Sequence, residues 1–296
     1  MAISASLLRI QLKLVKGILK NLDLSSTRQA QDRLGMLMAK TQGSKVNYST
    51  EVFKSFMGEW IVPKDTRHKG VMLYLHGGGY VSGNIDYAKG FGTILAAKHG
   101  IRVFCAAYRL APEHPYPAAL EDAMESYEFL LSRGYEPKDI VLCGESAGGG
   151  LIYALIHRLR ELSRPLPSGL VAISPWLDMT LSGASYEEVG DKDPALSKEC
   201  LEYYASLYSG ESDMENPLLS PLFGDVTDFP PSLIFVGSNE ILLDDSVRMH
   251  KKLRDSGGKS SIYIARNRWH AYVLYGVNPS ARNHSQIAHF IKDVTS

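Results

Sequence analysis

Short apolar runs rich in β-branched residues recur along the chain, and segments with helical periodicity separate most of them. The apolar runs predict strands near 50–55, 58–62, 71–75, 101–107, 139–143, 169–174, 232–237 and 260–265. The helical patterns lie near 86–98, 117–133, 147–162, 241–256 and 281–293. From residue 71 onward strand and helix alternate, and this predicts an α/β fold with a mainly parallel sheet and helices on both faces.

Two parts of the chain depart from this alternation. No helix separates the first two predicted strands, so we expect them to form an antiparallel edge. Residues 1–45 are helical and precede the sheet, and residues 180–229 separate two strands by far more than one crossover needs. We expect 1–45 and 180–229 to form a cap over the C-terminal edge of the sheet, and 46–179 and 230–296 to form the core.

The N-terminal segment has one apolar stripe and a basic polar side. Its apolar positions recur with helical spacing at Leu8, Leu12, Val15, Leu19 and Leu22. Such a helix could lie on a membrane surface, or it could pack on its own protein, and we expect packing because one stripe is what any packed helix shows. No apolar run approaches the roughly 20 residues of a membrane span, so we expect no stable membrane insertion.

Charge and cysteine content narrow the function classes. Acidic and basic residues balance at 32 each, so no basic excess suggests nucleic acid as a partner. Three cysteines do not make a disulfide framework, and Cys105 and Cys143 lie in apolar runs typical of buried thiols. A reducing, cytoplasmic setting fits this pattern.

The strongest chemical motif is Gly144-Glu145-Ser146-Ala147-Gly148, which stands between a predicted strand and a predicted helix. This is the context that a G-x-S-x-G nucleophile elbow requires. The two glycines leave room for neighbouring backbone in a tight, strained turn that aims the Ser146 hydroxyl out of the sheet. The next helix points its N-terminus at the site and stabilises negative charge there. The alternative, a glycine-rich turn without chemistry, is less favoured in this context.

A second motif, His76-Gly77-Gly78-Gly79, comes directly after the strand at 71–75. Successive glycines let backbone N–H groups face a ligand, which suits an oxyanion hole, and the N–H of Ala147 is expected to join them. A phosphate-binding loop is the rival interpretation, but neither glycine run has the spacing of one. His76 precedes the serine at a strand end, and we interpret it as a loop-bracing residue.

A serine nucleophile needs a base, and in a strand–elbow–helix arrangement the order is serine, acid, histidine. Four histidines lie in the last fifty residues of the chain, after the serine motif: His250, His270, His284 and His289. Three of them lie within predicted helices and are most simply surface or packing residues. His270 stands in a loop just past the last predicted strand, at the sheet edge where Ser146 is expected, so the sequence favours His270 as the base.

With these residues identified, the chain resembles the hormone-sensitive lipase family of α/β-hydrolase esterases. Four motifs carry the resemblance: HGGGY at 76–80, YRLAPEHPYPAALED at 108–122, GESAGG at 144–149 and NPLLSPL at 216–222. The resemblance implies an eight-stranded core, a helical cap, no metal and no organic cofactor. It also implies hydrolysis of short- to medium-chain carboxylic esters, and it suggests a homodimer.

The resemblance assigns roles to single residues. It implies Gly78 and Gly79 as oxyanion donors with Ala147. It also implies that Arg109, Glu113 and Asp122 only brace the structure. The sequence departs from the family pattern in Glu145, where aspartate is commoner, and in Ala271-Tyr272, where Gly-Phe is usual.

The acid of the triad has more than one candidate in the sequence. The family motif resembles Asp-Pro-Leu-x-Asp, and this chain has Glu-Ile-Leu-Leu-Asp at 240–244. Glu240 comes three residues after Gly237, in the loop past a strand, and glutamate is an accepted acid in this order of triad. Asp244 and Asp245 lie a turn later, where acids at a helix start need no catalytic role. We therefore predict Glu240 as the acid, with Asp244 as the alternative.

Together these residues predict a serine carboxylesterase with Ser146, His270 and Glu240 as triad and a small-molecule ester as substrate. Two other functions remain open from sequence. One is a receptor on the same fold that binds a small molecule without turnover, although such a protein tends to lose a triad member. The other is an amidase, peptidase or lactonase that uses the same residues.

Overall fold

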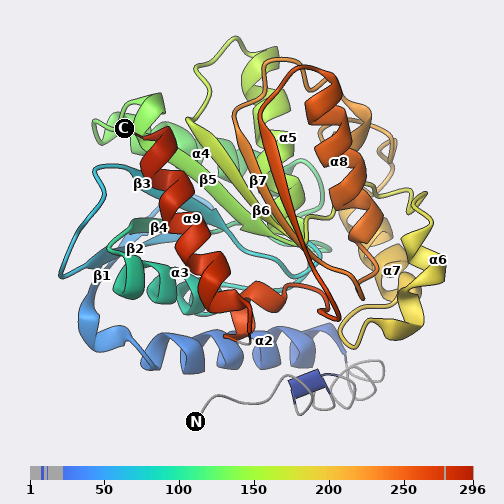
Figure 1. Ribbon diagram of the computed structural model, residues 1–296, viewed down its shortest axis with the longest axis horizontal. Coiled ribbons are helices and arrows are strands. Elements are labelled where there is room, and N and C mark those ends of the chain that lie inside the picture. Colours follow the sequence, from blue (N-terminus) through green and yellow to red (C-terminus); the bar gives the residue numbers. More distant parts are fainter. Residues whose placement is uncertain (1–7, 10–11, 13–22, 277, 296) are drawn as a thin grey trace.

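The chain forms an eight-stranded sheet with helices on both faces (Figure 1). The computed structural model describes residues 8–9, 12, 23–276 and 278–295. The strands lie in the order β1-β2-β4-β3-β5-β6-β7-β8. Strand β2 pairs antiparallel with β1 and β4, and every other neighbouring pair is parallel. The predicted α/β architecture and its antiparallel edge are therefore confirmed.

The element bounds agree closely with the predicted pattern. The strands are β1 (Val46–Val52), β2 (Met57–Pro63), β3 (Val71–Leu75), β4 (Arg102–Ala107), β5 (Ile140–Glu145), β6 (Gly169–Ile173), β7 (Ser232–Gly237) and β8 (Ser260–Ala265). The α-helices are α2 (Leu24–Lys40), α3 (Ile85–His99), α4 (Ala118–Ser132), α5 (Ala147–Glu161), α6 (Ser185–Glu188), α7 (Lys198–Ser209), α8 (Leu243–Asp255) and α9 (Ser280–Val294).

The first strand is the one misplaced element. The sequence predicts it near 50–55, but β1 ends at Val52 and residues 53–56 form a turn closed by a hydrogen bond from Phe53 N–H to Phe56 O. The apolar signal came from the turn, where the rings of Phe53 and Phe56 stack with centroids 4.3 Å apart. The strand itself is polar because it lies at the exposed edge of the sheet.

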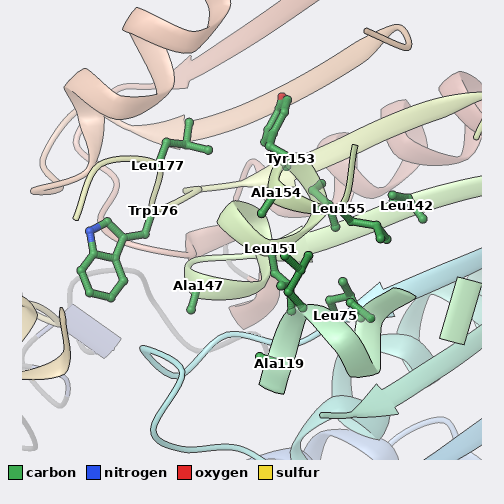
Figure 2. Close-up of a cluster of buried hydrophobic side chains, with 14 of the residues drawn as sticks. Leu75, Ala119, Leu142, Ala147, Leu151, Tyr153, Ala154, Leu155, Trp176 and Leu177 are labelled. Carbon is green, nitrogen blue, oxygen red and sulfur yellow. The ribbon is translucent and has the colours of Figure 1, made fainter. Parts of the chain in front are cut away.

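The two faces of the sheet bury separate cores. Along β3, Val71, Leu73 and Leu75 face the helices α4, α5 and α8, whereas Met72 and Tyr74 face α3 and α9. Figure 2 shows the first core, in which side chains of α5 lie against the central strands. Burial on both faces explains why these strands are almost wholly apolar in sequence.

The segments 1–45 and 180–229 contact the core and each other. Arg9 Nη2 donates to Lys192 O at 3.1 Å, and the side chains of Leu8 and Leu12 pack against the core. Packing on its own protein is therefore confirmed for the described part of the N-terminal segment, whereas Val15, Leu19 and Leu22 lie outside the described residues. Within the described residues, the main helix of the 180–229 insertion is α7. Within the described ranges, no helix is both long and apolar enough to cross a bilayer.

Helices α2 and α3 contact each other at a glycine of each helix, Gly35 and Gly90. A Cβ atom on Gly35 would lie 2.3 Å from Asp86 O, and one on Gly90 would lie 2.9 Å from Gly35 Cα. The helices can approach this closely only because both positions are glycine. The contact places α2 beside the loop that extends from the end of β3.

We predict that Gly35→Ala destabilises the protein by about 1–3 kcal/mol, because the methyl group would meet backbone that must shift. Alanine favours a helix by about 1 kcal/mol over glycine, so without this contact the substitution would stabilise. Thermal unfolding measures the sign, and limited proteolysis reports whether α2 detaches. Arg33→Ala, at an exposed position of α2, is the control and is expected to stay within about 0.5 kcal/mol of wild type. A rise in Tm for Gly35→Ala contradicts the packing argument.

Candidate active site

Ser146 stands between β5 and α5 in the strained backbone that a nucleophile elbow requires. Its φ is 55° and its ψ is −122°, and the residue is 7% exposed. A Cβ on Gly144 would lie 2.2 Å from Gly148 O, and one on Gly148 would lie 2.0 Å from Leu75 O. Larger residues at either position would force the turn open, so the two glycines allow the strain at Ser146 to persist.

The glycine loop after β3 lies directly against this turn. A Cβ on Gly77 would lie 3.0 Å from Ser146 Cβ, so the loop backbone and the serine are neighbours. Gly78 and Gly79 both have positive φ, at 117° and 63°, which glycine adopts without strain. Ala147, the first residue of α5, is fully buried. The loop and the start of α5 thus bring together the backbone that the sequence predicts as the oxyanion hole.

His76 braces the glycine loop, as predicted. Its ring is buried and stacks on Tyr108 with centroids 4.3 Å apart, and Nδ1 lies 2.8 Å from Gly77 O. Burial lowers the pKa of His76 to about 4, so the ring is neutral near pH 7. A neutral ring whose Nδ1–H is donated to Gly77 O serves to hold the loop.

Glu240 and His270 lie together in the interior. Glu240 Oε1 is 3.6 Å from His270 Nδ1, and the two side chains are 0% and 9% exposed. Neither of these atoms has a hydrogen-bond partner among the described residues, and each is buried. A movement of about half an ångström would complete an N–H···O bond between them, and such bonds are often long in unliganded sites. The pairing leaves His270 Nε2 as the nitrogen that can act as a base.

Ser174 joins the acid loop to the histidine loop. Its hydroxyl donates to Glu240 Oε2 at 2.9 Å, and its Oγ accepts from Ala271 N–H at 3.0 Å. Gly237 N–H donates to the same carboxylate oxygen at 2.7 Å. Ser174 was not predicted from the sequence, although its place just after β6, beside the elbow, could have suggested it.

The charges of Glu240 and His270 are coupled. Burial alone would lower the pKa of His270, but the interaction of its ring with the nearby Glu240 carboxylate outweighs burial and raises the pKa above 6.5. Burial raises the pKa of Glu240, and His270 opposes that rise. Asp193 of the 180–229 insertion is also buried and interacts with His270 by charge. Its Oδ2 accepts from Ile241 N–H at 3.1 Å, directly beside Glu240.

The other two candidate acids, Asp244 and Asp245, bind residues of the 180–229 insertion. Asp244 Oδ2 accepts from Ser185 N–H at 3.0 Å. Asp245 is fully buried, accepts from the N–H groups of Leu177 and Asp178, and accepts from the Tyr186 hydroxyl at 2.9 Å. Both acids lie in the first turn of α8, as predicted. They also accept hydrogen bonds from backbone N–H groups of other segments. No contact of either residue with His270 is found in the described part of the chain.

The remaining predicted residues have structural environments. His250 Nδ1 is paired with Ser260 Oγ, His284 Nε2 is 2.8 Å from Val273 O, and His289 is exposed. Three residues from the 108–122 motif brace the core. Arg109 pairs with the buried carboxylate of Asp122, and Glu113 accepts both guanidinium donors of Arg28 on α2.

Of the aromatic residues of the insertion, Tyr204 of α7 touches the glycine loop. A Cβ on Gly79 would lie 2.3 Å from its ring. Tyr208 is buried and stacks on Tyr80, whereas Tyr203 is largely exposed. A cavity of about 650 Å³ lies between α2 and the β1–β2 turn, and its lining does not include Ser146. Ser146 itself is buried.

Comparisons with known proteins agree with this geometry. A family model described as the alpha/beta hydrolase fold matches residues 72–274. The chain is similar to an acetyl-hydrolase of Streptomyces hygroscopicus, with 36% identity over 78% of this chain and 77% of the relative. It is also similar to an esterase of Acinetobacter venetianus, with 36% identity over 69% of this chain and 68% of the relative.

Solved structures extend the likeness to the whole chain. An esterase from the bacterial hormone-sensitive lipase family has a TM-score of 0.90 and 31% identity, covering 100% of both chains. EstE5 soaked by p-nitrophenyl butyrate has a TM-score of 0.87 and 29% identity, covering 93% of this chain and 92% of EstE5. The chain therefore belongs to the hormone-sensitive lipase family of carboxylesterases, which is built on the alpha/beta-hydrolase fold.

Proposed function

We propose that the protein hydrolyses short- to medium-chain carboxylic esters with Ser146 as nucleophile, His270 as general base and Glu240 as the acid of the triad. The observation that carries the proposal is the strained Ser146 backbone beside the glycine loop, on a fold shared with esterases. The buried Glu240–His270 pair supports it. The combination of φ 55° and ψ −122° is strained for a non-glycine residue and is what a nucleophile elbow requires.

The reaction proceeds in two halves through an acyl-enzyme. Ser146 Oγ attacks the ester carbonyl while His270 Nε2 accepts its proton, and the carbonyl oxygen becomes an anion. The N–H groups of Gly78, Gly79 and Ala147 stabilise that anion. His270 then gives its proton to the departing alcohol. Water attacks the acyl-enzyme with His270 again as base, and the carboxylic acid product leaves.

Glu240 keeps the imidazole in the working tautomer. Its Oε2 is held by Gly237 N–H and the Ser174 hydroxyl, which leaves Oε1 to face His270 Nδ1. With the proton on Nδ1, the lone pair of Nε2 is available to Ser146. The carboxylate then stabilises the imidazolium that forms in the transition state.

We further propose that 1–45 and 180–229 act as the cap over a core formed by 46–179 and 230–296. Arg9 contacts the insertion, Arg28 Nε donates to Val81 O at 2.7 Å, and Tyr204 covers Gly79. This cap would select the acyl chain. The homodimer suggested by the resemblance stays a prediction.

Ser146→Ala is expected to lower kcat by several orders of magnitude, on the order of 10⁶ if the triad acts as a unit. Steady-state hydrolysis of p-nitrophenyl butyrate measures the loss, and circular dichroism verifies folding. Ser132→Ala, at an exposed position at the end of α4, is the matched control and should keep full activity. Near-normal hydrolysis by folded, pure Ser146→Ala protein would refute the mechanism.

Glu240→Gln is expected to lower kcat by about 10²–10⁴-fold, because the amide cannot stabilise the imidazolium. In the wild type, kcat/KM should fall as the pH drops through the pKa of His270, which lies above 6.5 because of Glu240. Removing the charge lowers that pKa, so the acid limb should move to lower pH in the variant. Asp244→Asn should leave kcat and the profile close to wild type. The opposite pattern would transfer the role to Asp244.

A panel of p-nitrophenyl acetate, butyrate, octanoate and dodecanoate tests the proposed acyl preference. We expect a higher kcat/KM for acetate or butyrate than for dodecanoate, because Tyr204 limits the space above Gly79. Matched amides and lactones belong in the same panel. Faster turnover of an amide or a lactone than of every ester would replace the proposed substrate class.

A further inference from the structure

Glu145 is a buried carboxylate beside the catalytic serine, and the proposed reaction gives it no role. It ends β5 and is 1% exposed. Its Oε1 accepts from Gly77 N–H at 2.7 Å, and its Oε2 accepts from the Tyr74 hydroxyl at 2.5 Å. One side chain therefore spans from the residue before the nucleophile to the glycine loop after β3.

The backbone of Gly77 is held at both its N–H and its carbonyl oxygen. Its N–H is bound to Glu145, and its carbonyl oxygen accepts from His76 Nδ1 and from Gln31 Nε2 of α2, at 2.8 Å and 3.4 Å. A Cβ on Gly77 would lie 2.8 Å from Glu145 O, so the loop is pressed against the end of β5. Glu145 is the partner that joins this peptide to the strand carrying Ser146.

The bond to Gly77 fixes the start of a segment that has no side chains of its own. Gly78 and Gly79 come next in the chain and could adopt many backbone conformations. Their N–H groups stabilise an oxyanion only if they point to one place before the charge develops. A fixed Gly77 peptide sets the starting direction of both residues.

We propose that Glu145 is a positioning residue for the oxyanion hole, which holds the Gly77 peptide at a set distance from Ser146 so that Gly78 and Gly79 point at the developing anion. The proposal rests on the proposed function, in which these two glycines are the donors. Glu145 acts through the loop and does not touch the substrate.

The charge of Glu145 has a second effect at the site. Burial raises the pKa of Glu145 to about 7, although hydrogen bonds from Tyr74, Gly77 and Tyr87 oppose that rise. When ionised, it adds to the interactions that raise the pKa of His270. The other titratable groups that face Glu145 are Tyr74, Tyr87, Tyr108, Tyr275, Cys105 and Cys143. Each of these is neutral near pH 7, because burial raises its pKa above the ordinary value.

Two variants separate the hydrogen bond from the charge. Glu145→Met removes the acceptor at similar length, whereas Glu145→Gln keeps a carbonyl oxygen for Gly77 N–H but loses the charge. Glu59→Gln is the control, because Glu59 is a buried carboxylate of β2 that is bonded to Thr50, outside the site. Each variant is active-site titrated with diethyl p-nitrophenyl phosphate, and kcat, KM and inhibition by an alkyl trifluoromethyl ketone are measured.

For Glu145→Met we expect kcat per titrated site to fall about 10–100-fold with KM nearly unchanged, since oxyanion stabilisation acts in the transition state. The Ki of the trifluoromethyl ketone, whose adduct with Ser146 carries an oxyanion, should rise by a similar factor. A merely structural role would lower Tm and the titrated fraction but leave kcat per site and Ki at wild-type values. That result would overturn the proposal.

Glu145→Gln gives an answer even if the methionine variant does not fold. We expect its kcat above the acid limb to stay within a few-fold of wild type and the acid limb of kcat/KM to move to lower pH, because the anion that raises the pKa of His270 is gone. An acid limb at the wild-type pH would rule out the charge effect, and a kcat loss of about 10-fold or more for Glu145→Gln would show that the bond to Gly77 is not the cause. Hydrolysis by Ser146→Ala would instead overturn the proposed function, so the two failures can be told apart.

Discussion

The site depends on the close approach of two backbones: the loop after β3 and the turn between β5 and α5. Gly148 stands where a side chain would strike Leu75 O, and Gly77 stands where one would crowd Ser146. Since both segments lack side chains there, the serine can be strained and still lie directly beside the backbone of the glycine loop. The parallel pairing of β3 with β5 brings these two strand ends to the same edge of the sheet.

A second convergence brings the proposed acid and the proposed base together. Strands β6, β7 and β8 end beside one another, and Ser174, Glu240 and His270 come from the loops at their C-terminal ends. Ser174 bonds to both other loops, so the acid and the histidine share one support. The two bonds of Ser174 and the contact between Glu240 and His270 are all buried. Water therefore competes little with them, and the low local dielectric strengthens the charge interaction between Glu240 and His270.

Helix α2 and the 180–229 insertion form hydrogen bonds with the same loops. Gln31 and Arg28 of α2 bond to the loop at Gly77 and Val81, and Asp193 of the insertion bonds beside Glu240. These polar contacts link the covering segments to both halves of the site. A carbonyl or amide at a strand end needs a partner when it is covered, and residues from distant parts of the chain provide those partners.

The sequence by itself determined the α/β architecture, the elbow motif and the glycine loop, because apolar periodicity and glycine spacing are local properties, and chain order predicted His270 as the base. It misplaced β1, because the aromatic pair Phe53 and Phe56 belongs to a turn. It ranked Glu240 above Asp244 by position, but only the tertiary structure put Glu240 opposite His270 and Asp244 against Ser185. Ser174, Asp193 and the bond from Gly77 to Glu145 were decided by tertiary structure alone, since each joins residues that no local pattern connects.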